Sequence, residues 1–266
     1  MVDGYLNILV NLDQYGHKEI ERSRLQDILG WGRSVEIFYT FSIEALISFL
    51  NRKNPDALER QLRHMQLSGR DFDELRSKTT KTAWLGTAER IVFDALQSCA
   101  EYVSPFSINN PAGWEYWLVH FAKSHRARQV YNNILHKNAC DQAHFGRSGL
   151  QMLSYDPSRE GQLYLFDDSA RGRAFESLCD DVPRLVMEVG DAMEVADFFT
   201  AAYKQTPAHA DDINRAIIES DDVEVFTKHG GERRTPHNIE PTDILRVKRQ
   251  MQLFSRSTLP ASKKCT

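Results

Sequence analysis

The segment NILVNLDQYG, residues 7–16, decides the class of fold to which this chain is assigned. Its apolar run, residues 8–10, leads into a loop that reads Asp13-Gln14-Tyr15-Gly16. An apolar run that ends in polar and aromatic residues is typical of a buried parallel strand. In α/β folds the loops at the carboxyl ends of such strands bind ligands. The segment therefore predicts a strand followed by a candidate binding loop.

Strand and helix signals alternate after this segment. A short helix has Leu25, Ile28 and Leu29 on one face, and a β-branched and aromatic strand follows at residues 34–41. Ser42 can cap the helix after that strand, because its hydroxyl can accept a hydrogen bond from a free backbone N–H. The first part of the chain is therefore predicted to have β-α-β-α order.

The alternation resumes after a polar stretch. Residues 56–82 contain few apolar anchors and predict irregular structure or a marginal helix. Apolar residues recur at helical spacing over residues 88–99, which predicts a helix. A strand is predicted at 115–122, and another helix begins after Ser124. The apolar face predicted for this last helix consists of Ala127, Val130, Tyr131, Ile134 and Leu135. The order predicts an α/β fold with a mostly parallel sheet covered by helices.

The pattern changes beyond a turn-rich segment, YDPSREGQ, at residues 155–162. We place a domain boundary there, which gives domains 1–157 and 158–266. The second domain has three helical stripes, a strand at 223–227 and a hairpin tip at 228–234 with two glycines. This is the order of a winged helix, so we predict a carboxyl-terminal α+β, winged-helix-like domain. A last helix is predicted from Pro241 to about Phe254.

Composition restricts the classes of protein to which the chain can belong. Its 266 residues are 41% hydrophobic, which is enough to bury a sizeable core. No apolar run approaches the ~18 residues of a membrane span, and the amino terminus does not resemble a signal peptide. The four cysteines form no Cys-x-x-Cys pair and predict reduced thiols. We therefore expect a cytoplasmic protein with no membrane partner.

Charge is unevenly distributed along the carboxyl-terminal part. Residues 160–224 contain five basic and 16 acidic side chains, whereas residues 225–256 contain seven basic and three acidic ones. Basic clusters of this kind are typical of nucleic-acid binding. The predicted nucleic-acid-binding residues are Lys228, Arg233, Arg234, Arg246, Lys248 and Arg249. However, the helix at 210–222, in the position of a recognition helix, is acidic, which slightly favours docking on protein or a structural role.

Three stretches, in this order, resemble the three-Cys-motif partner proteins: NILVNLDQYGHKEIERSRLQDIL, VEIFYTFSIEALISFL and YWLVHFAKSHRARQVYNNILHKN. The resemblance covers roughly residues 5–157 and, more loosely, the winged-helix-like part. It implies a partial class I methyltransferase-like, Rossmann-like sheet with helices. It also implies a partner, a three-Cys-motif protein encoded nearby, in a phage or mobile-element setting.

The resemblance also assigns roles to the opening loop. Asp13 and Tyr15 take the catalytic positions of methyltransferases that act on exocyclic amines. There the carboxylate accepts amine hydrogens and the ring stacks on the target base. Gln14 and Gly16 complete the substrate loop, with Gln14 in the position of a proline, which makes the loop less rigid.

Only residues 1–6 precede the opening strand, so the family's glycine-rich cofactor loop is not expected in this chain. The expected cofactor is none for this chain and S-adenosylmethionine for the intact protein. A sheet cut beside its central strand would leave an unpaired edge, which favours a fragment over a natural short form. The favoured function is an accessory protein that works with the three-Cys-motif protein. The alternatives are a fragment of an amine methyltransferase acting on nucleic acid, or a winged-helix nucleic-acid-binding protein, so enzymatic activity stays open.

Two further motifs carry weaker signals. His136, Cys140 and His144 would share one helix face if the helix continued, but a structural zinc site needs four ligands, so no metal is predicted. The segment SHRAR, residues 124–128, starts a helix after a strand, where a phosphate could bind. No glycine-rich loop precedes this helix to bring its backbone close to a phosphate. The favoured interpretation is therefore that these residues are the solvent-exposed first turn of a helix.

Overall fold

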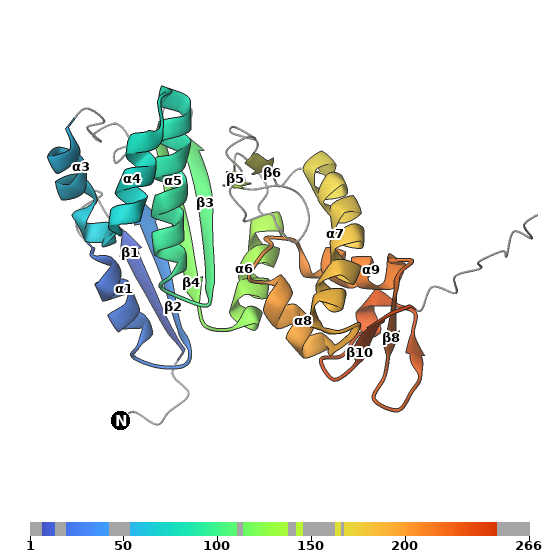
Figure 1. Cartoon of the computed structure of the whole chain (residues 1–266). Coiled ribbons are helices and arrows are strands. Elements are labelled where there is room, and N and C mark those ends of the chain that lie inside the picture. Colours follow the sequence, from blue (N-terminus) through green and yellow to red (C-terminus); the bar gives the residue numbers. More distant parts are fainter. Residues whose placement is uncertain are drawn as a thin grey trace, which may run out of the picture.

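The computed structural model describes residues 7–13, 20–42, 54–110, 114–137, 142–145, 163–165 and 168–248 (Figure 1). Helices and strands alternate in a mixed α/β fold, as the sequence predicts. The first part contains β1 (Ile8–Asp13), α1 (Arg22–Leu29), β2 (Val35–Phe41), α3 (Pro55–Leu62), the 3₁₀ helix η1 (Arg63–Met65), α4 (Gly69–Ser77), α5 (Lys81–Gln97), β3 (Tyr102–Asn110), β4 (Trp114–Ala122), α6 (His125–Lys137), β5 (Gln142–Phe145) and β6 (Leu163–Leu165).

The first part is built on a six-stranded sheet with the order β1-β2-β4-β3-β5-β6. Only β1 and β2 pair in parallel, and every other pair in this order is antiparallel. The prediction of a mostly parallel sheet is therefore wrong. The reason is β3, which the sequence analysis missed. Only three residues separate the end of β3 from the start of β4 in the sequence, and a connection this short can join only antiparallel strands.

One face of this sheet is covered by α1, α3, α4 and α5. The side chains of β2 alternate between buried and half-buried, and Ile37, Tyr39 and Phe41 point toward these helices. Leu25 of α1 and Leu96 of α5 belong to the same buried cluster. Burial of one face sets the strand register, because a slip by one residue would turn these side chains to the other face.

The segment predicted to be irregular or marginally helical, residues 56–82, forms most of α3, the 3₁₀ helix η1, α4 and the start of α5. Asn54 starts α3, since its side chain accepts a hydrogen bond from the N–H of Ala57 at 3.1 Å. Ser68 and Asp71 start α4 with a reciprocal capping box. These caps, together with a few well-placed apolar residues, compensate for the low apolar content of the segment.

The second part contains α7 (Asp168–Val189), β7 (Ala192–Glu194), α8 (Val195–Ala202), α9 (Ala210–Glu219), β8 (Val223–Phe226), β9 (Glu232–Arg233), the 3₁₀ helix η3 (Pro236–Asn238) and β10 (Ile244–Val247). Its four strands form an antiparallel sheet with the order β7-β10-β8-β9. The helix predicted to begin at Pro241 is wrong over residues 244–247. That segment is β10, in which the buried Leu245 pairs with both Met193 and Val225.

The two parts share a hydrophobic core. Tyr102 of β3 and Tyr131 of α6 belong to the same buried cluster as Phe198 and Tyr203 of the second part. Figure 1 shows α6 between the six-stranded sheet and the helices of the second part. The predicted boundary at residue 157 lies outside the described residues and stays a prediction. No helix in the described part of the chain is long and apolar enough to cross a membrane.

Candidate functional site

The opening loop begins at an exposed edge of the six-stranded sheet. Asp13 is the last residue of β1, its side chain is exposed, and it lies in register with Thr40 of β2. Leu9, in the same strand, is 65% exposed. The predicted partners of Asp13 in the loop, Gln14, Tyr15 and Gly16, lie outside the described residues. The assignment of this loop to catalysis and substrate binding therefore stays a prediction.

The arginines predicted to bind nucleic acid are paired with carboxylates. Arg233 donates to both oxygens of Asp243 at 2.9 and 3.2 Å, and it contacts Glu240 at 3.2 Å. The hydrogen bond to Asp243 raises the pKa of Arg233. Asp243 is buried and also accepts the backbone N–H of Glu240 at 2.8 Å. Arg233 therefore secures the chain between β9 and β10.

The other members of this cluster are more exposed. Arg246 donates to Glu224 at 2.9 and 2.7 Å and lies 4.5 Å from the ring centroid of Phe226. Arg234 contacts Glu232 at 3.0 Å. Lys228 and Lys248 are exposed, whereas Arg249 lies outside the described residues. The nucleic-acid interface stays a prediction, but the three described arginines of this cluster are each paired with a nearby carboxylate.

Helix α9, which was predicted to take the position of a recognition helix, presents an acidic surface. Asp211 and Glu219 are exposed, and Asp221 and Asp222 follow the helix and are also exposed. Arg215 is held by Glu219 at 2.7 Å. Acidic side chains repel the phosphate backbone of nucleic acid. The described surface of α9 is thus better suited to contact protein than DNA.

A buried polar cluster lies where α6 packs against the six-stranded sheet. It consists of His120, Arg128, Tyr131 and Asn132, each of which is buried. His120 bonds Glu36 through Nε2 at 2.9 Å, and its ring lies 4.4 Å from that of Tyr131. Burial lowers the pKa of His120 and lowers the pKa of Arg128 to about 9. Clusters of buried groups with shifted pKa values are candidates for functional sites.

This cluster was not predicted from the sequence, because the buried face of α6 is shifted from the predicted one. Tyr131 and Leu135 are buried, as predicted. Val130 and Ile134, predicted to be buried, are 47% and 52% exposed. Arg128 and Asn132 are fully buried instead, so the interpretation of residues 124–128 as a solvated helix start is wrong for Arg128. The available signal was the spacing i, i+3, i+4 of Arg128, Tyr131 and Asn132, which places them on one helix face.

Helix α6 is also bonded to the segment between α8 and α9. Asn132 donates to the carbonyls of Thr206 and Ala208 at 3.0 and 3.2 Å. His136 bonds the carbonyl of Pro207 through Nε2 at 3.1 Å. Burial lowers the pKa of His136 to about 4, so the ring is neutral at pH 7 and its N–H donates to this carbonyl. These bonds hold the two parts of the molecule together at α6.

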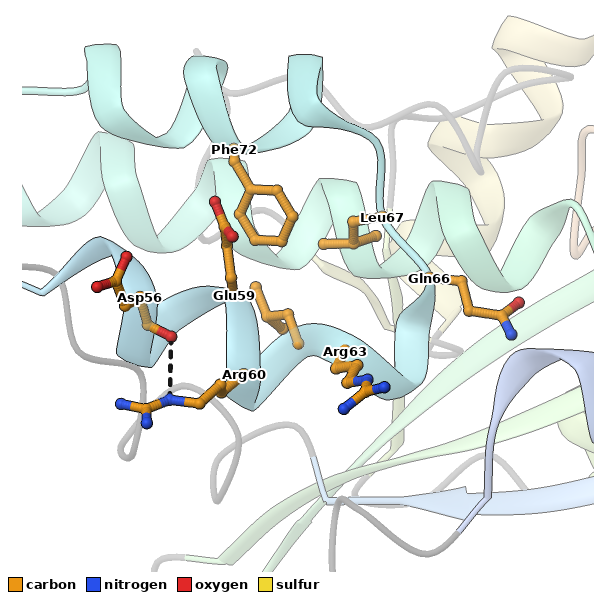
Figure 2. A pocket seen from close by; sticks show the side chains of 8 residues that line it. Asp56, Glu59, Arg60, Arg63, Gln66, Leu67 and Phe72 are labelled. Carbon is orange, nitrogen blue, oxygen red and sulfur yellow. Dashed lines mark hydrogen bonds between the residues drawn. The ribbon is translucent and has the colours of Figure 1, made fainter.

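A surface hollow of about 540 Å³ lies between α3, η1 and α4 (Figure 2). Its charges are engaged or solvated: Arg60 donates to the carbonyl of Asp56 at 3.2 Å, and Glu59 contacts Arg76 at 2.7 Å. The full lining is Asp56, Glu59, Arg60, Leu62, Arg63, Gln66, Leu67 and Phe72. The hollow is open and carries both signs of charge, so it is a weaker candidate than the buried cluster at α6.

The structure also explains why His136, Cys140 and His144 cannot share one helix face. Helix α6 ends at Lys137, and His144 belongs to strand β5. Cys140 lies outside the described residues. In the described part of the chain no group of three or more His, Cys, Asp or Glu side chains could hold a metal ion.

Comparison of the chain with models of protein families, with curated proteins and with solved structures finds no match in any of the three.

Proposed function

We propose that this chain is a methyltransferase-like accessory protein that works in complex with a second polypeptide, the three-Cys-motif protein. The observation that carries the proposal is the strand order β1-β2-β4-β3. The second half of a class I methyltransferase sheet has two parallel strands and then a hairpin. The last strand of that hairpin is antiparallel to the other three and inserts between the second and the third of them. Here β1, β2 and β3 run in one direction, and β4 inserts between β2 and β3 in the other.

The position of Asp13 supports the same kinship. It ends β1, the first strand of this half-sheet, which is where the amine methyltransferases have their substrate loop. The alternative is that the intact protein is itself an S-adenosylmethionine-dependent amine methyltransferase acting on nucleic acid. In that case Asp13 would accept hydrogen bonds from the target amine, and Tyr15 would stack on the base.

The edge of the sheet supports the involvement of a second polypeptide. Among the described strands, β1 pairs only with β2. Parallel strands are normally buried on both faces, but β1 is exposed at every second residue, including Leu9. An exposed edge strand with an apolar side chain is a template for pairing with another chain.

The second part supports docking on protein. Its element order is α7-β7-α8-α9-β8-β9-β10, and β10 lies between β7 and β8 in its sheet. These orders are compatible with the proposed winged-helix-like module. The paired arginines and the acidic α9 favour a protein contact for this module over nucleic acid.

Isothermal titration with S-adenosylmethionine distinguishes the accessory protein from the enzyme. We expect the purified full chain to give no binding heat, because the proposed accessory protein does not bind the cofactor by itself. Binding in the micromolar range by this chain alone would favour the enzyme and contradict the accessory role.

Co-purification with the three-Cys-motif protein tests the sheet edge. We expect Leu9→Lys to weaken the complex at least tenfold, since it places a charge on the exposed face of β1. Val189→Lys is the matched control, because Val189 is 59% exposed at the end of α7, far along the chain from β1. If both variants bind equally, β1 is not the contact surface.

A further inference from the structure

Arg128 is a buried charge that has no counterion among the described residues. It is the fourth residue of α6, and its side chain has no exposed surface. None of its three guanidinium nitrogens has a hydrogen-bond partner in the described part of the chain. The effective penalty for burying such an ion is several kcal/mol, and a partner normally offsets it. A bound anion would offset this penalty.

The surroundings of Arg128 compensate for little of this penalty. Its Cζ lies 5.9 Å from the centroid of the Tyr131 ring, which is the outer limit of a cation–π contact. The hydroxyl of Tyr131 likewise has no hydrogen-bond partner among the residues that the structure describes. The nearby His120 is neutral at pH 7, because burial lowers its pKa, and Arg128 lowers it further. The carboxylate of Glu36 is engaged by the ring of His120.

We propose that Arg128 is the anchor of an oxyanion-binding site between α6 and the end of α8, and that the site takes a carboxylate or a phosphate group. The planar guanidinium offers two parallel N–H donors, which match the two oxygens of such a group. The free hydroxyl of Tyr131 supplies a further donor. Because Arg128 lies in the first turns of α6, the positive end of the helix dipole also favours an anion there.

Entry to this site requires movement of the second part. Tyr203, the residue after α8, interacts electrostatically with Arg128 and belongs to the same buried cluster as Tyr131. The segment after it is held on α6 by Asn132. The structure therefore shows the closed form of the site, and the oxyanion binds when Tyr203 and residues 204–208 shift away from α6.

Thermal unfolding of the full chain tests the site. The protein is titrated with inorganic phosphate in one arm and with acetate in the other, each against sodium chloride at equal ionic strength. We expect one or both oxyanions to raise the Tm by about 3–5 °C at ten times the Kd, because they bind only the folded state. The two arms distinguish a phosphate ligand from a carboxylate ligand.

Two variants show whether Arg128 is responsible. Arg128→Met is expected to lose the rise in Tm. Arg126→Met is the matched control, since it removes the same charge from an exposed position of α6, and it is expected to keep the rise. If Arg128→Met does not fold, Arg128→Lys replaces it, because lysine keeps the charge but lacks the planar pair of donors.

Two results would overturn the proposal. One is a wild-type Tm that does not depend on phosphate or acetate at fixed ionic strength. The other is an equal rise in Tm for the wild type and for the variant at Arg128. The experiment is independent of the three-Cys-motif protein and of S-adenosylmethionine, so its failure leaves the proposed accessory function standing.

Discussion

Single buried side chains on α6 connect the two parts of the molecule. Asn132 satisfies two carbonyls of the second part, and His136 satisfies a third. Arg128 lies on the same side of the helix, but its guanidinium has no hydrogen-bond partner in the described segments. Buried polar groups are costly when they are unsatisfied, so these residues restrict α6 to one orientation more strictly than apolar residues would.

His136 makes the stability of the protein depend on pH. Burial lowers its folded-state pKa to about 4 from an ordinary value of 6.5. Between these two pH values the unfolded state binds more protons, so stability rises with pH and is complete above about 6.5. We expect the wild type to lose on the order of 2–3 kcal/mol from this ring as the pH falls toward 4.

Urea unfolding of the wild type and of His136→Gln between pH 4 and 8 measures this effect. Glutamine keeps a donor for the carbonyl of Pro207 but does not titrate. The difference in unfolding free energy between the two proteins should therefore change across this range. Two parallel stability profiles would show that the pKa of His136 is not lowered.

At the scale of elements, pairing between distant segments overrides local signals. Residues 244–247 follow a helix start signal, but they form β10 because they complete the sheet between β7 and β8. Helix α6 is helical as predicted, but its buried face is shifted and includes Arg128 and Asn132. Asn132 donates its hydrogen bonds to the second part. Apolar residues at helical periodicity indicate that one face of the helix will be buried, but the element that packs against the helix decides which face it is.

The connection between β9 and β10 gives a test of the basic cluster. Arg233→Ala is expected to lower the Tm, because it leaves the buried Asp243 without its cation, whereas Arg234→Ala is expected to leave the Tm unchanged. Neither variant should alter a gel shift with duplex DNA at about 150 mM salt if the module docks on protein. Salt-sensitive retardation that Arg234→Ala weakens at an unchanged Tm would instead support a nucleic-acid interface.

At the scale of the whole molecule, the shared core should make unfolding cooperative. The four tryptophans lie in the first 117 residues, so their fluorescence reports on the first part, whereas circular dichroism reports on the helices of both parts. We expect tryptophan fluorescence and circular dichroism to give the same midpoint for the unfolding transition.

Phe198→Ala tests this coupling. Phe198 is fully buried in α8, and its truncation should cost about 3–5 kcal/mol. If the core is shared, the variant lowers the midpoint of the tryptophan signal as much as that of the circular dichroism. A tryptophan midpoint that stays at the wild-type value would show that the two parts unfold separately.

The sequence by itself determined the features that depend on local patterns. The strands β1, β2, β4 and β8 and the helix α6 are recognisable because side-chain periodicity, β-branched residues and capping residues act within a few positions of each other. For the same reason the mixed α/β class and the position of Asp13 at a strand end could be predicted.

Only the tertiary structure decided the features that depend on distant partners. These are the insertion of β4 between β2 and β3, the formation of β10 in place of a helix, and the burial of Arg128. Strand pairing joins segments far apart in the sequence, and a local pattern does not specify the partner. The burial of a charged side chain likewise follows from packing between elements, because every local signal places arginine in water.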